Sequence, residues 1–100
     1  MLTYYVVYGN AERVEPAGVF AVDPGSGHAL MWNHRQRRWF FAPAAVARFL
    51  DDPRNLDRYE EADRATVDRV VPSLTGGVEL PTEDEIVAVF RRSAEPTPRS

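Results

Sequence analysis

The segment GVFAVDPGSGHALMWNHRQRRWFF, residues 18–41, decides the fold, because it alternates apolar runs with two polar turns. The runs at 18–23, 28–33 and 38–41 are rich in aromatic and β-branched residues and predict three short strands. The first turn, 23–27 (DPGSG), contains a proline that presets φ and glycines that tolerate positive φ. The first two of these strands are therefore predicted to form a hairpin.

The second turn, residues 34–37 (HRQR), is polar and lacks the glycine signature of a tight hairpin, which leaves its register open. If the loop comprises these residues alone, Trp32 lies directly across from Trp39 in the neighbouring strand. Such an aromatic pair contributes about 0.5–1.5 kcal/mol beyond the area that it buries. We therefore expect the pair to stabilise this end of the sheet.

Residues 2–8 (LTYYVVY) predict a further strand, because a run of aromatic and β-branched residues ends at a Gly-Asn turn. Side chains on both faces of this strand are apolar, so we expect it to be central in a sheet or covered on its second face. The fold class that follows is α+β: an N-terminal antiparallel β-meander of three to four strands packed against two to three C-terminal helices.

Helical patterns follow the strands. Pro43 suits the first position of a helix, and the apolar residues behind it recur at i, i+3 and i+4 until the helix ends at 51–53 (DDP). The next segment, 55–62 (NLDRYEEA), is ambiguous between loop, short strand and helix. The apolar stripe of this first helix is Val46, Phe49 and Leu50.

Two more helices are predicted. Asp63 is a good N-cap for the second, but Pro72 lies inside its apolar pattern and is expected to stop or kink the helix one residue earlier. Thr82 and Glu85 form a capping box that begins a helix over 83–93. The apolar stripes of the two helices are Val67, Val70, Val71 and Leu74, and Ile86, Val89 and Phe90.

We expect a single domain, residues 1–93, and a disordered tail, 94–100, which contains two prolines and no apolar anchor. The chain has no cysteine, which excludes disulfides, thiolate metal sites and cysteine nucleophiles. Its longest apolar stretch, 39–47, is far shorter than the ~20 residues of a membrane helix. Residues 1–5 lack the features of a signal peptide, so we expect a cytoplasmic protein without membrane contact.

The sequence contains no recognisable catalytic motif. The patterns GxxxxGK[ST], GxGxxG and GxSxG are absent. His28 and His34 are the only histidines, and no further ligands stand at a familiar metal spacing. The adjacent carboxylates at 51–52 and at 60–61 point apart, so neither pair opposes an acid to a base. We therefore expect no enzymatic activity, no cofactor and no metal.

Residues 32–41 (WNHRQRRWFF) place three arginines and a histidine between two tryptophans. Arginine and tryptophan are enriched at binding hot spots, because both bury a large area and arginine adds directed hydrogen bonds. The net charge of −3 is unevenly distributed: 34–50 carry +4, 1–33 carry −2 and 51–100 carry −5. The candidate binding residues are Trp32, His34, Arg35, Arg37, Arg38 and Trp39.

Three functions are compatible with this pattern. We expect a small accessory or regulatory module that binds a protein or peptide partner, preferably an acidic one, through its sheet and the arginine hairpin. A nucleic-acid-binding regulator is an alternative, but the acidic net charge and the acidic start of the 83–93 helix oppose it. A structural homodimer, joined through the 2–8 strand or the Trp32/Trp39 face, is the other alternative.

Overall fold

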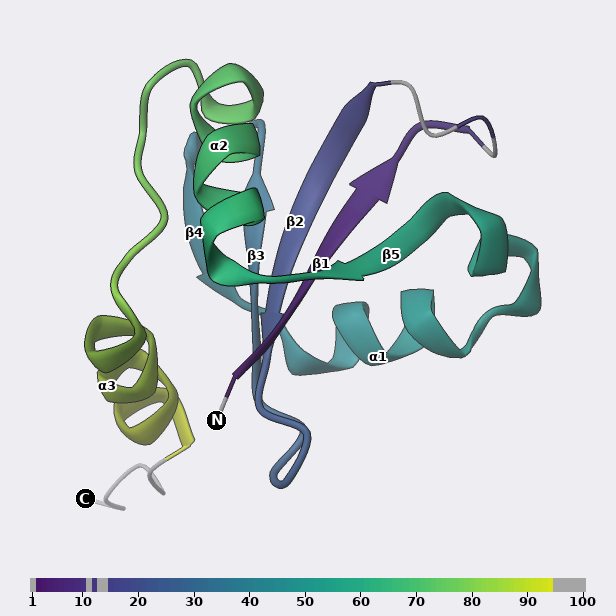
Figure 1. The fold of residues 1–100 in the computed structure, drawn as a ribbon. Helices are drawn as coiled ribbons and strands as arrows, with labels where there is room; N and C mark the ends of the chain where they lie inside the picture. The colour runs from purple at the N-terminus through teal and green to yellow at the C-terminus, as the bar shows by residue number, and fades with distance from the viewer. Residues whose placement is uncertain (1, 11, 13–14, 95–100) are drawn as a thin grey trace.

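Helices pack on both faces of one sheet in the computed structural model, which describes residues 2–10, 12 and 15–94 (Figure 1). The described residues form five antiparallel strands in the order β4-β3-β2-β1-β5. The strands are β1 (Thr3–Tyr8), β2 (Pro16–Val22), β3 (Ala29–Asn33), β4 (Arg38–Phe41) and β5 (Tyr59–Ala62). The helices are α1 (Pro43–Asp51), the 3₁₀ helix η1 (Pro53–Arg58), α2 (Arg64–Thr75) and α3 (Glu83–Ala94). The predicted α+β class is confirmed.

The predicted meander is present, and its strands begin and end close to the predicted residues. β4 spans the predicted residues, and β2 begins at Pro16 rather than at residue 18. Trp32 pairs directly with Trp39, and their ring centroids lie 5.2 Å apart. The expected aromatic pair is confirmed.

β5 extends the sheet on the far side of β1. The second half of the ambiguous segment 55–62 forms this strand, and the first half belongs to η1. β5 runs antiparallel to β1, with Tyr5 opposite Glu61 and Val6 opposite Glu60. β1 therefore has a neighbour on each side, as expected of a strand with apolar side chains on both faces.

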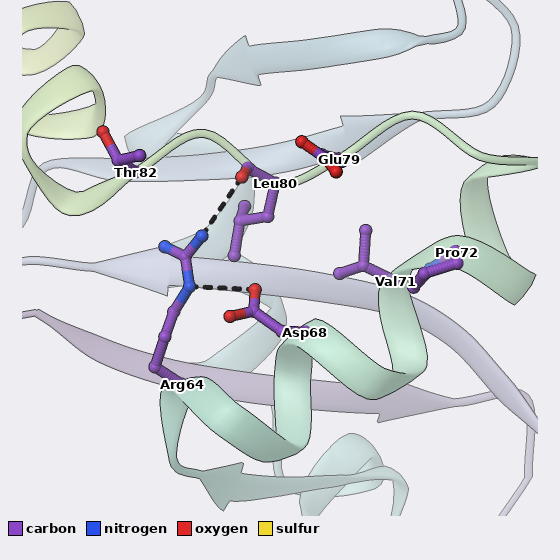
Figure 2. Close-up of a pocket in the computed structure, with 7 residues that line it drawn as sticks. All are labelled: Arg64, Asp68, Val71, Pro72, Glu79, Leu80 and Thr82. Carbon is purple, nitrogen blue, oxygen red and sulfur yellow. Dashed lines mark hydrogen bonds and ion pairs between the residues drawn. The ribbon is translucent and has the colours of Figure 1, made fainter.

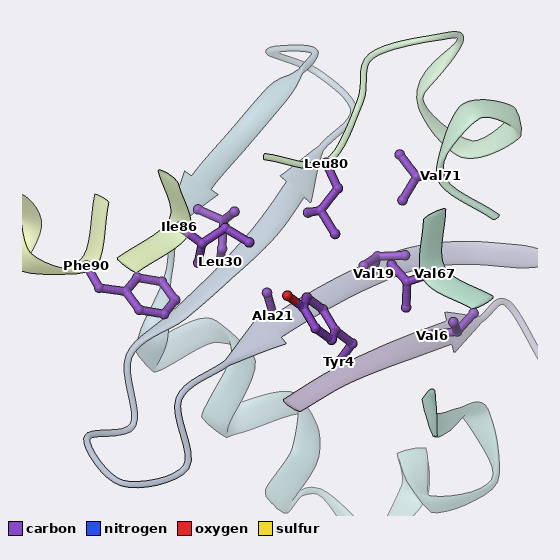
Figure 3. Close-up of a cluster of buried hydrophobic side chains, with 10 residues drawn as sticks. All are labelled: Tyr4, Val6, Val19, Ala21, Leu30, Val67, Val71, Leu80, Ile86 and Phe90. Carbon is purple, nitrogen blue, oxygen red and sulfur yellow. The ribbon is translucent and has the colours of Figure 1, made fainter. Parts of the chain in front are cut away.

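Two apolar clusters lie on opposite faces of the sheet. α1 covers one face, where Val46 packs with Val7, Phe20 and Ala29. α2 and α3 cover the other face (Figure 3), so Val6 belongs to a different cluster from its neighbour Val7. The larger cluster, on the α2 face, comprises Tyr4, Val6, Val19, Ala21, Leu30, Val67, Val71, Leu80, Ile86 and Phe90.

The predicted caps begin the second and third helices. Asp63 accepts a backbone N–H at 2.8 Å at the start of α2. At the start of α3, the Thr82 N–H donates to Glu85 Oε1 (3.0 Å) and the Glu85 N–H donates to Thr82 Oγ1 (3.2 Å). This reciprocal pair is a capping box. α3 extends to Ala94, one residue beyond the prediction, and the rest of the predicted tail, 95–100, lies outside the described residues.

Of the two predicted effects of Pro72, a stop or a kink, the stop is wrong, because α2 continues past Pro72 to Thr75. Pro72 lies in the last turn of the helix, where its missing N–H removes a single hydrogen bond. Val71 and Thr75, 1% and 2% exposed, hold this turn against the sheet. Gly76, at φ 72°, ends the helix in the left-handed conformation, and the Pro72 carbonyl accepts the Gly77 N–H at 3.1 Å. Packing and the glycine cap therefore override the proline.

The loop between α2 and α3, residues 76–82, is fixed by side chains of α2 and β4. It descends beside β4 in Figure 1, and its Leu80 is 5% exposed. Three successive carbonyls of the loop each accept a side-chain hydrogen bond, which satisfies acceptors that lie outside any helix or strand. The bonds run from Thr75 Oγ1 to Val78 O (2.6 Å), from Trp39 Nε1 to Glu79 O (3.0 Å) and from Arg64 Nη2 to Leu80 O (3.1 Å).

Candidate functional site

The turn between β3 and β4 carries two of the predicted arginines, Arg35 and Arg37. Asn33 organises the turn: its Oδ1 accepts the Gln36 N–H (2.9 Å), and its carbonyl accepts the Arg37 N–H (2.8 Å). Arg37 adopts φ 54°, in the left-handed region that favours glycine. The turn therefore closes without a glycine, at a cost of about 1–2 kcal/mol in backbone strain.

The side chain of Arg37 anchors this turn to α2. Its Nη2 donates to the Thr75 carbonyl at 3.3 Å. That carbonyl lies at the C-terminal end of the helix, where the helix dipole favours a cation. A Cβ at Gly76 would stand 2.9 Å from the same nitrogen, so the guanidinium occupies space that only glycine leaves open.

Gly76→Ala is expected to lower the free energy of unfolding by about 1–2 kcal/mol, because alanine disfavours φ 72° and its methyl group displaces Arg37. Gly9→Ala is the matched control, since nothing described lies within 4 Å of its Cβ position. We expect the control to change stability by less than about 0.5 kcal/mol. Urea unfolding of both variants measures the difference, and equal losses would contradict the anchor.

Three other predicted residues are also tied into the fold. Trp32 is 4% exposed, and its indole N–H donates to His34 Nδ1 at 3.2 Å. His34 Nε2 lies 3.2 Å from the Ala17 carbonyl of β2, so the imidazole links β2 to β3. Trp39 is half-buried and donates to the Glu79 carbonyl in the loop after α2. These side chains hold the hairpin in place.

Arg38 and Arg35 remain available to a partner. Arg38 is exposed and lies on the α1 face of β4, opposite to Trp39, because neighbouring side chains of a strand alternate. Its guanidinium carbon lies 4.6 Å from the centroid of the Phe40 ring, a cation–π contact. Arg35 is exposed in the turn, and it has no ion pair within the part of the chain that the structure describes.

Phe40 joins the candidate site, although it is not among the residues predicted from the sequence. It is half-buried, and its ring supports the exposed guanidinium of Arg38. The signal for it was the two-residue period of a strand, which places Phe40 and Arg38 on one face. The structure therefore separates the six predicted residues: four fix the hairpin, and two arginines remain exposed, Arg38 beside the Phe40 ring and Arg35 in the turn.

The outer edge of β4 has no strand paired with it among the described residues. The Ala42 N–H donates to the Ala29 carbonyl (2.9 Å), which marks a hydrogen-bonded pair at the end of the β3–β4 ladder. Because such pairs alternate in an antiparallel ladder, Trp39 and Phe41 direct their backbone N–H and C=O groups away from β3. Among the described residues, no hydrogen bond reaches these outward groups. β4 therefore offers main-chain donors and acceptors to an extended chain.

The opposite edge of the sheet, β5, carries the opposite charge. Glu60 and Glu61 are exposed there, and Glu60 Oε1 accepts the Tyr8 hydroxyl at 2.8 Å. β4 contains Arg38 and no acidic residue. An acidic segment is therefore attracted to β4 and repelled by β5.

A cleft of about 360 Å³ lies between α2 and the loop that follows it (Figure 2). Its arginine, Arg64, donates to Asp68 Oδ1 (2.9 Å), the Leu80 carbonyl (3.1 Å) and the Tyr4 hydroxyl (3.3 Å). The Tyr4 hydroxyl donates to Glu83 Oε1 (3.2 Å); burial raises its pKa above the ordinary 10.0, and Arg64 opposes the rise. Since the guanidinium already serves three acceptors of the fold, this cleft is a structural junction.

Within the described part of the chain, neither histidine lies in a cluster of metal ligands. His28 packs against Phe41 and Phe90, with its ring centroid 5.7 Å from each of theirs. His34 links two strands, as described above. Across the described residues, no three His, Cys, Asp or Glu side chains gather as metal ligands would.

The surfaces that suggested a homodimer lie largely inside the chain. β1 has a strand on each side, and its Tyr4 is 3% exposed. Trp32 is buried to a similar degree. Tyr5, Tyr8 and Trp39 are half-buried, and a homodimer through these surfaces stays a prediction.

Comparisons with known proteins do not assign the chain to a family. No protein-family model, no curated protein and no solved structure matches it. None of the helices in residues 2–10, 12 and 15–94 has the length and hydropathy that crossing a membrane requires. The candidate site therefore rests on the geometry of β4 alone.

Proposed function

We propose that the protein is a small non-enzymatic accessory or regulatory module of the cytoplasm, which binds an extended segment of a protein partner along the outer edge of β4. The observation that carries the proposal is an open main-chain edge beside an exposed arginine, Arg38. An extended segment adds to such an edge through main-chain hydrogen bonds. Arg35 and Arg38 favour a segment with acidic residues.

The rest of the hairpin supports this role because it holds the edge rigid. Arg37 is bonded to the end of α2, and Trp39 is bonded to the loop that follows. Trp32 and His34 link β3 to β2. A preorganised edge loses little conformational entropy when a partner binds, so more of the interaction energy appears as affinity.

The nucleic-acid alternative has less support. Arg37 is engaged with α2, which leaves fewer cations in the turn for phosphates. The first turn of α3 carries Glu83, Asp84 and Glu85. Nucleic-acid affinity depends on the number of phosphates that a protein neutralises, and this surface offers few cations for them.

A library of random peptides displayed on phage and selected on the full chain tests the proposal. We expect enriched peptides to contain acidic residues and to shift the backbone NMR signals of Trp39 and Phe41 more than those of β5. Replacing both Arg35 and Arg38 with serine is expected to weaken these peptides about tenfold, as the loss of two exposed ion pairs predicts. Replacing Arg91 and Arg92 with serine is the matched control and is expected to leave the affinity unchanged.

Two results would refute the proposal. One is the absence of any enriched peptide. The other is enrichment of peptides that shift the protein's NMR signals in elements other than β3 and β4, because such peptides bind elsewhere on the chain.

A further inference from the structure

The open edge of β4 also dictates the order of side chains in the segment that binds it, an inference that rests on the proposed function. All strand pairs among the described residues are antiparallel. Antiparallel pairing is also the more stable arrangement per residue. A segment added to β4 in the same way runs antiparallel to it.

Main-chain and side-chain contacts then fall on alternate residues of the segment. The segment residue opposite Trp39 exchanges N–H···O=C bonds with it, because Trp39 directs these groups outward. The residues on either side lie opposite Arg38 and Phe40, and their own N–H groups point away from β4. Side-chain recognition therefore belongs to residues that make no main-chain bond to β4.

The α1 face of β4 can recognise two kinds of side chain. The Arg38 guanidinium lies 4.6 Å from the centroid of the Phe40 ring, so a charge and an apolar surface stand side by side. Directly opposite side chains of an antiparallel pair have Cβ atoms about 4.5–5.5 Å apart. A carboxylate opposite Arg38 reaches the guanidinium, and an apolar side chain opposite Phe40 covers the ring.

The other face of β4 is already occupied. Trp39 donates to the Glu79 carbonyl, and the Phe41 ring centroid lies 5.9 Å from that of Phe90 in α3. Glu79 also adds a negative charge to the loop on this side. A small neutral residue therefore suits the segment position opposite Trp39.

We infer that the partner segment reads, from its N-terminus to its C-terminus, apolar residue, small neutral residue, acidic residue. The order follows from direction: β4 runs from Arg38 to Phe40, so an antiparallel segment meets Phe40 first and Arg38 last. The reverse order places the carboxylate over the aromatic ring and the apolar side chain over the guanidinium.

Two peptides of identical composition test this order. The first is Thr-Thr-Phe-Thr-Glu-Thr-Thr, the second is Thr-Thr-Glu-Thr-Phe-Thr-Thr, and both have blocked termini. NMR titration of the full chain measures their dissociation constants through the backbone signals of Trp39 and Phe41. We expect the first peptide to bind about fivefold more tightly, the ratio that one exposed ion pair and one cross-strand contact support.

Methylation of single amide nitrogens in the first peptide tests the alternation. N-methylation of the central threonine, opposite Trp39, is expected to weaken binding about tenfold or more, because it removes a main-chain donor and places a methyl group against β4. N-methylation of the glutamate, whose N–H points away, is expected to leave the affinity within about twofold. If N-methylation of the glutamate weakened binding and N-methylation of the central threonine did not, the peptide would add parallel to β4, and the inferred order would be overturned.

A charge exchange tests the contact with Arg38. Arg38→Glu is expected to weaken the first peptide and to restore affinity for a version in which lysine replaces glutamate. Arg91→Glu, an equal change of charge on α3, is expected to do neither. Equal changes of peptide affinity in the Arg38→Glu and Arg91→Glu variants would show that the glutamate of the peptide does not contact Arg38.

The remaining outcomes separate this inference from the proposed function. Equal affinity of the two peptide orders overturns the order and leaves binding at β4 intact. Failure of every peptide, including the library, refutes the proposed function as well. Self-association that Arg38→Glu and Glu61→Lys each abolish would assign the edge to a second copy of the chain and overturn the inferred segment.

Discussion

Phe90→Ala is expected to lose about 3–5 kcal/mol of unfolding free energy, a large share of the roughly 5–15 kcal/mol that stabilises a typical domain. Phe90 is 3% exposed, and together with Ile86 it anchors α3 on the sheet. Its ring centroid lies 5.9 Å from that of Phe41 and 5.7 Å from that of His28. Removal of the ring leaves a cavity that the surrounding side chains only partly fill.

Phe40→Ala is the matched control, because it removes the same side chain from the half-buried edge of the sheet. We expect the control to cost about 1 kcal/mol, the centre of the distribution for single substitutions. Urea unfolding followed by tryptophan fluorescence and circular dichroism measures both variants. A loss for Phe90→Ala no larger than that of the control would show that α3 does not pack as described.

Arg64→Met is expected to lower the free energy of unfolding by about 2–3 kcal/mol, because it removes three charge-assisted hydrogen bonds and keeps most of the apolar stem. Arg64 joins β1, α2 and the loop after α2 through the Tyr4 hydroxyl, Asp68 and the Leu80 carbonyl. After the substitution the Leu80 carbonyl loses its donor from the protein and depends on water from the adjoining cleft.

Arg69→Met provides the comparison on the same helix. Arg69 is exposed, and its guanidinium donates to Thr66 Oγ1 on the helix surface. We expect this variant to change stability by less than about 0.5 kcal/mol under the same unfolding conditions. Similar losses of unfolding free energy in the two variants would show that Arg64 does not hold these elements together.

The features predictable from sequence are those determined by nearby residues. The capping box of Thr82 and Glu85 needs only a backbone turn between them, and both of its hydrogen bonds form. The Trp32/Trp39 pair follows from the length of one turn. In both cases, residues that are close in the sequence determine the interaction.

The features that could not be predicted depend on distant contacts. β5 has two glutamates and a short apolar pattern, and it is a strand because β1 offers it an edge. α2 passes Pro72 because the burial of Val71 and Thr75 outweighs one lost hydrogen bond. The local sequence shows Val71 in an apolar stripe, but it shows neither the edge of β1 nor the burial of Thr75.

The candidate site divides in the same way. The sequence locates the arginines of the hairpin but gives no means of ranking Arg37 against Arg38. Arg37 adopts a left-handed backbone conformation, and its side chain reaches the end of α2. Arg38 is the first residue of β4, and its side chain lies on the α1 face of the sheet. That difference depends on the turn geometry and on where α2 ends, so only the folded chain reveals which arginine a partner can reach.

The position of β5 beside β1 has a consequence for how the chain folds during translation. Tyr5 pairs with Phe20 on one side of β1 and with Glu61 on the other. A nascent chain therefore completes the first pairing early and leaves the second edge of a Tyr- and Val-rich strand unpaired until residue 62 has been made. Such edges template aggregation, and long-range strand pairing is slow, on the order of milliseconds to seconds. The pairing of β5 is thus the step that closes this edge of β1.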